Sequence, residues 1–152
     1  MPLTRLLTSR KTGIQVAALP LQRSPAGRVV VGLVTSRGTG RWVLPKGWPV
    51  PGVTLSETAA IEAREEAGLV GAVDQVPIGK YRYRKGLHVL ASMLCEVQVF
   101  PLHVSEQLFA WREKKQRRVA FFWPEAAAEC VEEPELAALL RALSANGALD
   151  PS

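Results

Sequence analysis

Apolar residues along the chain run together or alternate in short stretches that are typical of β-strands. The run Val29–Thr35, VVVGLVT, is β-branched and nearly continuous, which indicates a strand covered on both faces. Similar stretches predict further strands at residues 13–18, 41–44, 72–77, 79–84, 88–100 and 119–123. Proline, glycine and serine between them predict a bend at residues 19–20 and turns at residues 24–27 and 37–40.

A stretch rich in alanine and glutamate predicts a helix over residues 55–67. Thr54 and Glu57 have the spacing of a capping box at its start, and Gly68 stands where a helix commonly ends. One flank of this helix suits packing against a sheet, since it carries the alanines at positions 59, 60, 63 and 67. Two further helices are predicted, over residues 124–131 and 133–143. Because helices cover sheet faces, the pattern predicts a mixed α/β domain.

The chain length and the lack of long apolar runs favour one soluble domain. A chain of 152 residues suits a single domain with its own core. No apolar run approaches the roughly 20 residues of a membrane span, and the first residues lack the apolar segment of a signal peptide. We therefore expect a cytoplasmic protein without membrane contact, in which Cys95 and Cys130 are buried thiols.

The charge of the chain leaves two kinds of partner open. A formal net charge of +5 suits either nucleic acid or a small polyanionic substrate. Most of the basic residues are expected on solvated surfaces. An RNA-binding module is the weaker interpretation, because no strand carries paired aromatic platforms or an RNP-like run. Nucleic acid is therefore an unlikely partner.

Three carboxylates crowd the predicted central helix. At about 100° per residue, Glu62, Glu65 and Glu66 fall within an arc of roughly 100°. Like charges at this spacing repel one another, and a divalent cation such as Mg²⁺ would offset that repulsion. The plain alternative is an exposed acidic face that meets only water. The loop at residues 46–53 favours the cation, because its glycines and prolines let the backbone approach a ligand.

The stretch from Gly47 to Leu69 resembles the Nudix box of Nudix hydrolases, G-x5-E-x7-R-E-U-x-E-E-x-G-U, where U is a bulky apolar residue. Gly47 takes the first position, and the later positions are taken by Glu62, Glu65, Glu66, Gly68 and Leu69, with Ala63 as a small stand-in at the internal apolar position. Two positions depart, because Val53 replaces the first Glu and Ile61 replaces the Arg. We interpret this double change as an apolar brace that replaces an ionic one, since losing one partner alone would strand a buried charge.

The resemblance extends over about residues 12–143 of a single domain spanning residues 1–152. VTSRGTGRWVLPKGWP, CEVQVFPL, WREKKQRR and FFWPEAAAECVEEPEL look like the branch near diphosphoinositol-polyphosphate and diadenosine-polyphosphate hydrolases. The family implies an α/β/α sandwich with a mixed sheet between helices. It also implies divalent-metal-dependent hydrolysis of a diphosphate linkage in a nucleoside-diphosphate-linked or polyphosphorylated small molecule. The alternative is a Nudix domain that binds a nucleotide as a sensor without cleaving it.

The resemblance also suggests roles for individual residues. Glu62 and Glu66 are the expected ligands of Mg²⁺, with Mn²⁺ as the alternative metal, helped by the main-chain carbonyl of Lys46. Glu65 is the candidate general base, although Glu65 and Glu66 can exchange roles as ligand and base. The residues expected at the substrate are Thr35, Ser36, Arg37, Gly47 and Arg117. Weaker candidates for phosphate contact are Arg10, Arg84 and Lys85.

Overall fold

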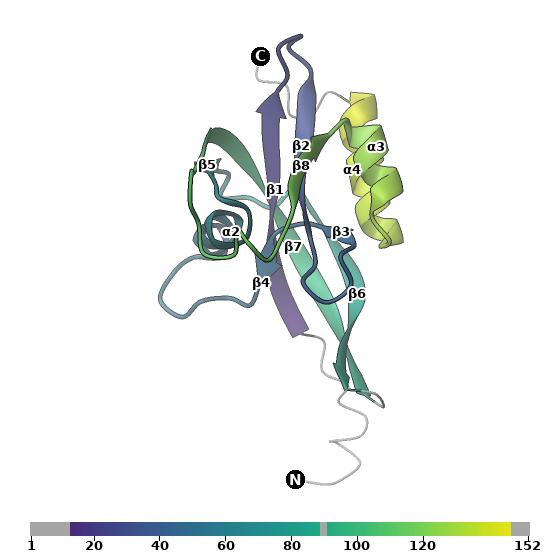
Figure 1. Cartoon of the computed structure of the whole chain (residues 1–152). Coiled ribbons are helices and arrows are strands. Elements are labelled where there is room, and N and C mark those ends of the chain that lie inside the picture. The colour runs from purple at the N-terminus through teal and green to yellow at the C-terminus, as the bar shows by residue number, and fades with distance from the viewer. Residues whose placement is uncertain (1–12, 89–90, 147–152) are drawn as a thin grey trace, which may run out of the picture.

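The protein is a mixed α/β domain, seen in a computed structural model that describes residues 13–88 and 91–146 (Figure 1). Its elements are β1 (Gly13–Arg23), β2 (Val29–Thr35), β3 (Trp42–Val43), β4 (Lys46–Gly47), α2 (Leu55–Glu62), a π-helical turn (Ala63–Ala67), β5 (Leu69–Val73), β6 (Gly79–His88), β7 (Ala91–Gln107), β8 (Val119–Phe122), α3 (Pro124–Cys130) and α4 (Pro134–Asn146). Among the helices of the described chain, none has the length and apolarity needed to cross a membrane.

The eight strands form one sheet, with β1 near its centre. The path through the sheet is β3-β2-β1-β7-β5, while β4 pairs with β1, β6 with β7 and β8 with β2. β1 runs parallel to β7 and antiparallel to β2 and β4. The sheet is therefore mixed, and the expected α/β/α arrangement is confirmed: α2 lies on one side of it and α3 and α4 lie on the other (Figure 1).

Two apolar layers hold the helices to the sheet, and β1 contributes to both because its side chains alternate in direction. Ala17 and Leu19 face the layer beneath α3 and α4, together with Leu136 and Leu140. The other layer lies beneath α2, where β1 supplies two buried residues and the helix supplies three alanines: Val16, Ala18, Ala59, Ala63 and Ala67. The predicted alanine flank is thus confirmed at positions 59, 63 and 67, while Ala60 is only half-buried.

Several element boundaries differ from the sequence prediction. β1 continues through the expected bend to Arg23, because it pairs with β7 along residues 13–21, including Pro20 opposite Leu102. β7 starts at residue 91 rather than 88 and runs on to residue 107, while β5 lies at residues 69–73 rather than 72–77. Part of the expected loop after residue 45 forms the short strand β4. Cys95 is buried as expected, whereas Cys130 is half-buried, and both are free thiols.

Candidate active site

A short strand places the glycine-containing loop directly against the acidic helix. β4 pairs with β1, with Gly47 opposite Val16. This pairing holds the backbone beside Glu66, so that the N–H of Lys46 donates to Glu66 Oε1 at 3.3 Å. At Gly47 a Cβ would lie only 2.4 Å from Glu62 Oε1. The loop backbone thus lies against both carboxylates, and a side chain at position 47 would displace Glu62; its approach to a ligand stays a prediction.

The central helix changes its winding between the first and second carboxylates. Residues 55–62 are α-helical, and their N-terminus has the predicted capping box of Thr54 and Glu57. Ala63–Ala67 then form a π-turn, which ends at Gly68 with φ of 67°. A π-turn uses i→i+5 hydrogen bonds and advances by a smaller angle per residue than an α-helix. Over the four residues from Glu62 to Glu66 the chain completes just under one turn, so Glu66 lies near Glu62. Over the three residues from Glu62 to Glu65 it falls well short of one turn, so Glu65 lies further round the helix axis.

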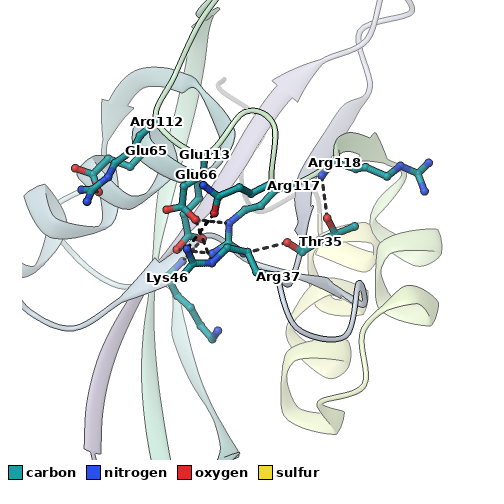
Figure 2. A network of polar contacts seen from close by, with 10 residues as sticks. Thr35, Arg37, Lys46, Glu65, Glu66, Arg112, Glu113, Arg117 and Arg118 are labelled. Atoms are coloured by element: carbon teal, nitrogen blue, oxygen red, sulfur yellow. Dashed lines mark hydrogen bonds and ion pairs between the residues drawn. The ribbon is translucent and has the colours of Figure 1, made fainter.

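Glu65 consequently points away from the other two carboxylates. Its Oε2 lies 3.6 Å from Arg112 Nη1 at the surface, and Figure 2 shows this pair apart from Glu66, Glu113 and Arg117. Within the described part of the chain, no three His, Cys, Asp or Glu side chains converge as a metal cluster. The expectation that Glu62, Glu65 and Glu66 share one face stays a prediction: the Glu65 carboxylate pairs with Arg112, while its charge still raises the pKa of Glu62.

Burial raises the pKa values of the other two carboxyls, Glu62 and Glu66. Glu66 is 7% exposed, and burial raises its pKa to about 8. The positive charge of Arg117 opposes this rise, and the adjacent Glu62 adds to it. The pKa of Glu62 is also raised, mainly by burial. Two adjacent carboxyls in a poorly hydrated place favour either a shared proton or a bound cation.

A third carboxylate, Glu113, reaches this pair from a distant part of the chain. It lies in the segment between β7 and β8, residues 108–118, which we call the arm. The charge of Glu113 raises the pKa of both Glu62 and Glu66. Arg117, also on the arm, lies 2.9 Å from Glu113 Oε1 and 3.5 Å from Glu66 Oε2 (Figure 2). Sequence reasoning missed Glu113, although it lies in the WREKKQRR run that carried the resemblance.

The predicted substrate residues meet the other end of the arm. The Thr35 carbonyl accepts from Arg117 Nη1 at 3.0 Å, and its hydroxyl accepts from the N–H of Arg118 at 2.8 Å. Arg37 is exposed and lies 3.5 Å from Glu113 Oε1. Ser36 shares a hydrogen bond with Thr39 inside the turn. The structure therefore brings Thr35, Arg37 and Arg117 together beside the carboxylates, while the Ser36 hydroxyl is engaged locally.

The donor atoms suit a hard divalent cation. Glu62 and Glu66 offer carboxylate oxygens, and the backbone of residues 46–47 runs alongside them. Mg²⁺ and Mn²⁺ both prefer such oxygen ligands. The raised pKa of the buried Glu66 is the observation that favours a cation here, because a bound cation would remove the repulsion that ionisation of the pair creates.

The Lys46 side chain points away from the carboxylates, toward the other face of the sheet (Figure 2). Its Nζ lies 5.0 Å from the ring centroid of Tyr83. Burial lowers the pKa of Lys46, against the opposing effect of Glu66. Of the weaker phosphate candidates, Arg84 is exposed and lies on β6 with the half-buried Lys85, whereas Arg10 lies outside the described residues.

The two departures from the box pattern lie outside the apolar layers described above. Val53 is 36% exposed. Ile61 is only half-buried, and neither residue belongs to the apolar layers among the described residues. Neither residue therefore packs into the apolar core, and a bracing contact between Val53 and Ile61 stays a prediction. The capping box and the buried alanines anchor this end of the helix.

Comparison with curated proteins finds relatives that are named as Nudix hydrolases. No family model matches the chain. It is 32% identical over 115 residues to Nudix hydrolase 16, mitochondrial, of Arabidopsis thaliana, an alignment that covers 73% of this chain and 63% of that protein. It is 36% identical over 88 residues to Nudix hydrolase 12, mitochondrial, of the same plant, covering 56% and 43%. The chain thus spans between 43% and 63% of the length of these relatives.

Solved structures share the fold at low sequence identity. A Caenorhabditis elegans Ap4A hydrolase in a binary complex superposes with a TM-score of 0.66 at 18% identity, covering 90% of this chain and 98% of that one. A Nudix hydrolase from Nitrosomonas europaea has a TM-score of 0.66 at 20% identity, covering 89% and 90%. With these folds, and with sequence relatives of the same family, the chain belongs to the Nudix hydrolase family.

Proposed function

We propose that the chain is a divalent-metal-dependent pyrophosphohydrolase that cleaves a diphosphate linkage in a nucleoside-diphosphate-linked or polyphosphorylated small molecule. The observation that carries this proposal is the pair of the half-buried Glu62 and the buried Glu66, which lies against the backbone of residues 46–47 with Arg117 beside it. Mg²⁺ is the proposed cofactor, with Mn²⁺ as the alternative. Diadenosine polyphosphates and diphosphoinositol polyphosphates are the candidate substrates.

The roles follow from position. Glu62 and Glu66, with the Lys46 carbonyl, would hold the cation, which when bound would neutralise charge on nonbridging phosphate oxygens. Arg37 and Arg117 would bind the phosphates, because a guanidinium matches their oxygens in a bidentate geometry. Thr35 supports this group by fixing the arm. Gly47 leaves room for the substrate and for Glu62.

Two residues compete for the role of general base. Glu65, the candidate from sequence, would have to leave Arg112 to reach a water molecule at the site. Glu113 already lies beside Arg117, and its charge raises the pKa of both Glu62 and Glu66. We therefore add Glu113 as the second candidate. Comparing the pH–rate profiles of Glu65→Gln and Glu113→Gln distinguishes them, because loss of the base removes the acidic limb of the profile.

The test is hydrolysis of a panel of pyrophosphate compounds with Mg²⁺ or Mn²⁺. We expect cleavage of at least one compound, and we expect Glu66→Gln to slow it by at least about a hundredfold, because the cation loses a charged ligand. Glu129→Gln, an exposed carboxylate on α3, is the matched control and should keep wild-type turnover. Wild-type turnover in Glu66→Gln would contradict the assignment.

A nucleotide sensor is the second candidate, favoured by the two departures at Val53 and Ile61 and by the displaced Glu65. Saturable binding of a panel member without cleavage would support it. A cytoplasmic location stays a prediction, since the two Arabidopsis relatives described above are named as mitochondrial. A fusion of the full chain to a fluorescent protein would test the location.

A further inference from the structure

We propose that Trp111 is a positioning residue that docks the arm on Gly68 and thereby sets Glu113 and Arg117 beside Glu62 and Glu66. The proposal rests on the proposed function for its consequence at the cation. The docking itself is a property of the fold and can be tested without any substrate.

The indole of Trp111 occupies the space that a side chain at position 68 would need. A Cβ placed on Gly68 would lie 2.3 Å from Trp111 Cε3 and 2.4 Å from Cδ2, so the indole lies directly over the glycine Cα. Gly68 also has φ of 67°, in the left-handed region where glycine is favoured. Gly68, which ends the π-turn, therefore also provides the surface against which Trp111 of the arm packs.

Backbone hydrogen bonds join the arm to the π-turn on both sides of Trp111. The N–H of Leu108 donates to the Gly68 carbonyl at 2.8 Å, and the N–H of Glu113 donates to the Glu65 carbonyl at 3.0 Å. Arg112 adds an ion pair to the Glu65 side chain. This gives Glu65 a structural part in holding the arm.

The docked arm delivers charged side chains to the site. Glu113 follows Trp111 by two residues, and its carboxylate is held by Arg117 at 2.9 Å. Arg117 in turn contacts Glu66 and the Thr35 carbonyl. A shift of the arm on the π-turn would move Glu113 most directly, because Arg117 and Arg118 are also held by Thr35 on β2.

Packing, rather than hydrogen bonding, carries the effect of Trp111. Its Nε1 is buried and has no hydrogen-bond partner among the described residues. The flat face of the ring is therefore the part that matters, and a phenylalanine ring can supply a similar face. Trp111→Phe should preserve docking, whereas Trp111→Ala should not.

Hydrogen exchange of the metal-free protein tests the docking. In Trp111→Ala we expect the amides of Leu108 and Glu113 to exchange at least about tenfold faster than in the wild type. The Thr58 amide, which donates to Thr54 within the helix start, should be unchanged. Trp111→Phe should exchange as the wild type does, and Trp123→Ala serves as a distant control. Unchanged protection of Leu108 and Glu113 in Trp111→Ala would overturn the proposal.

A double-mutant cycle on Mn²⁺ affinity tests whether Trp111 acts through Glu113. Measured by electron paramagnetic resonance, Trp111→Ala and Glu113→Gln should each weaken Mn²⁺ binding about tenfold. The double variant should bind no more weakly than Glu113→Gln alone, because the same interaction is removed twice. Additive losses would contradict the mechanism. Absence of Mn²⁺ binding in the wild type would contradict the proposed function, while the exchange result alone would still decide the role of Trp111.

Discussion

At the scale of single residues, Gly47 is the position where the loop and the helix constrain each other most tightly. A methyl group there would lie 2.4 Å from Glu62 Oε1 and 2.5 Å from Glu62 Cδ. Since the Glu62 side chain is flexible, we expect Gly47→Ala to displace the carboxylate rather than unfold the protein. Mn²⁺ affinity and turnover should fall by about tenfold, in line with loss of a correctly oriented ligand.

The control for this change is Gly86→Ala, because a Cβ at Gly86 would meet no atom within 4 Å. Isothermal titration with Mn²⁺ on both variants, with thermal midpoints recorded alongside, separates displacement of Glu62 from general destabilisation. Equal Mn²⁺ affinity in Gly47→Ala and the wild type would contradict the close approach.

At the scale of elements, the start of α2 depends on its capping box. The Thr54 hydroxyl accepts from the N–H of Glu57 at 3.1 Å, and the Glu57 carboxylate accepts from the N–H of Thr54 at 3.4 Å. We expect Thr54→Ala to lower the free energy of unfolding by about 1 kcal/mol, while Thr54→Ser keeps most of it because the hydroxyl remains. Urea titration measures both. Equal losses in the two variants would show that the hydroxyl is not the stabilising group.

At the scale of the whole molecule, the buried Glu66 carboxyl makes stability depend on pH. The pKa of Glu66 is about 8 in the folded protein, against an ordinary value of 4.5. The stability that this group contributes is therefore complete below about pH 4.5 and is lost as the pH rises through about 8, because the unfolded chain ionises first. Metal-free wild type should lose on the order of a few kcal/mol relative to Glu66→Gln across that window.

Chemical unfolding at several pH values, with a chelator present, measures this difference. Saturating Mn²⁺ should reduce the loss at the alkaline end, because a bound cation stabilises the ionised carboxylates. Parallel pH profiles of wild type and Glu66→Gln would contradict the raised pKa.

The sequence by itself determined the features that depend on near neighbours. The capping box at Thr54, the helix end at Gly68 and the strand Val29–Thr35 were predicted at their observed positions. The alanine flank follows from helical spacing alone, and the carboxylates of the box pointed to a cation before any contact was known. These features could be predicted because each depends on interactions a few residues apart along the chain.

Only the tertiary structure decided which charged groups meet. The π-turn turned Glu65 toward Arg112, and the arm brought Glu113 and Arg117 to Glu66 from about fifty residues further along the chain. The lengths of β1 and β7 were likewise set by their parallel pairing, which joins strands from opposite halves of the chain. Such contacts depend on the π-turn at residues 63–67 and on packing between distant parts of the chain. Neither leaves a periodic pattern in the sequence, because the energy that selects them comes from residues that become neighbours only on folding.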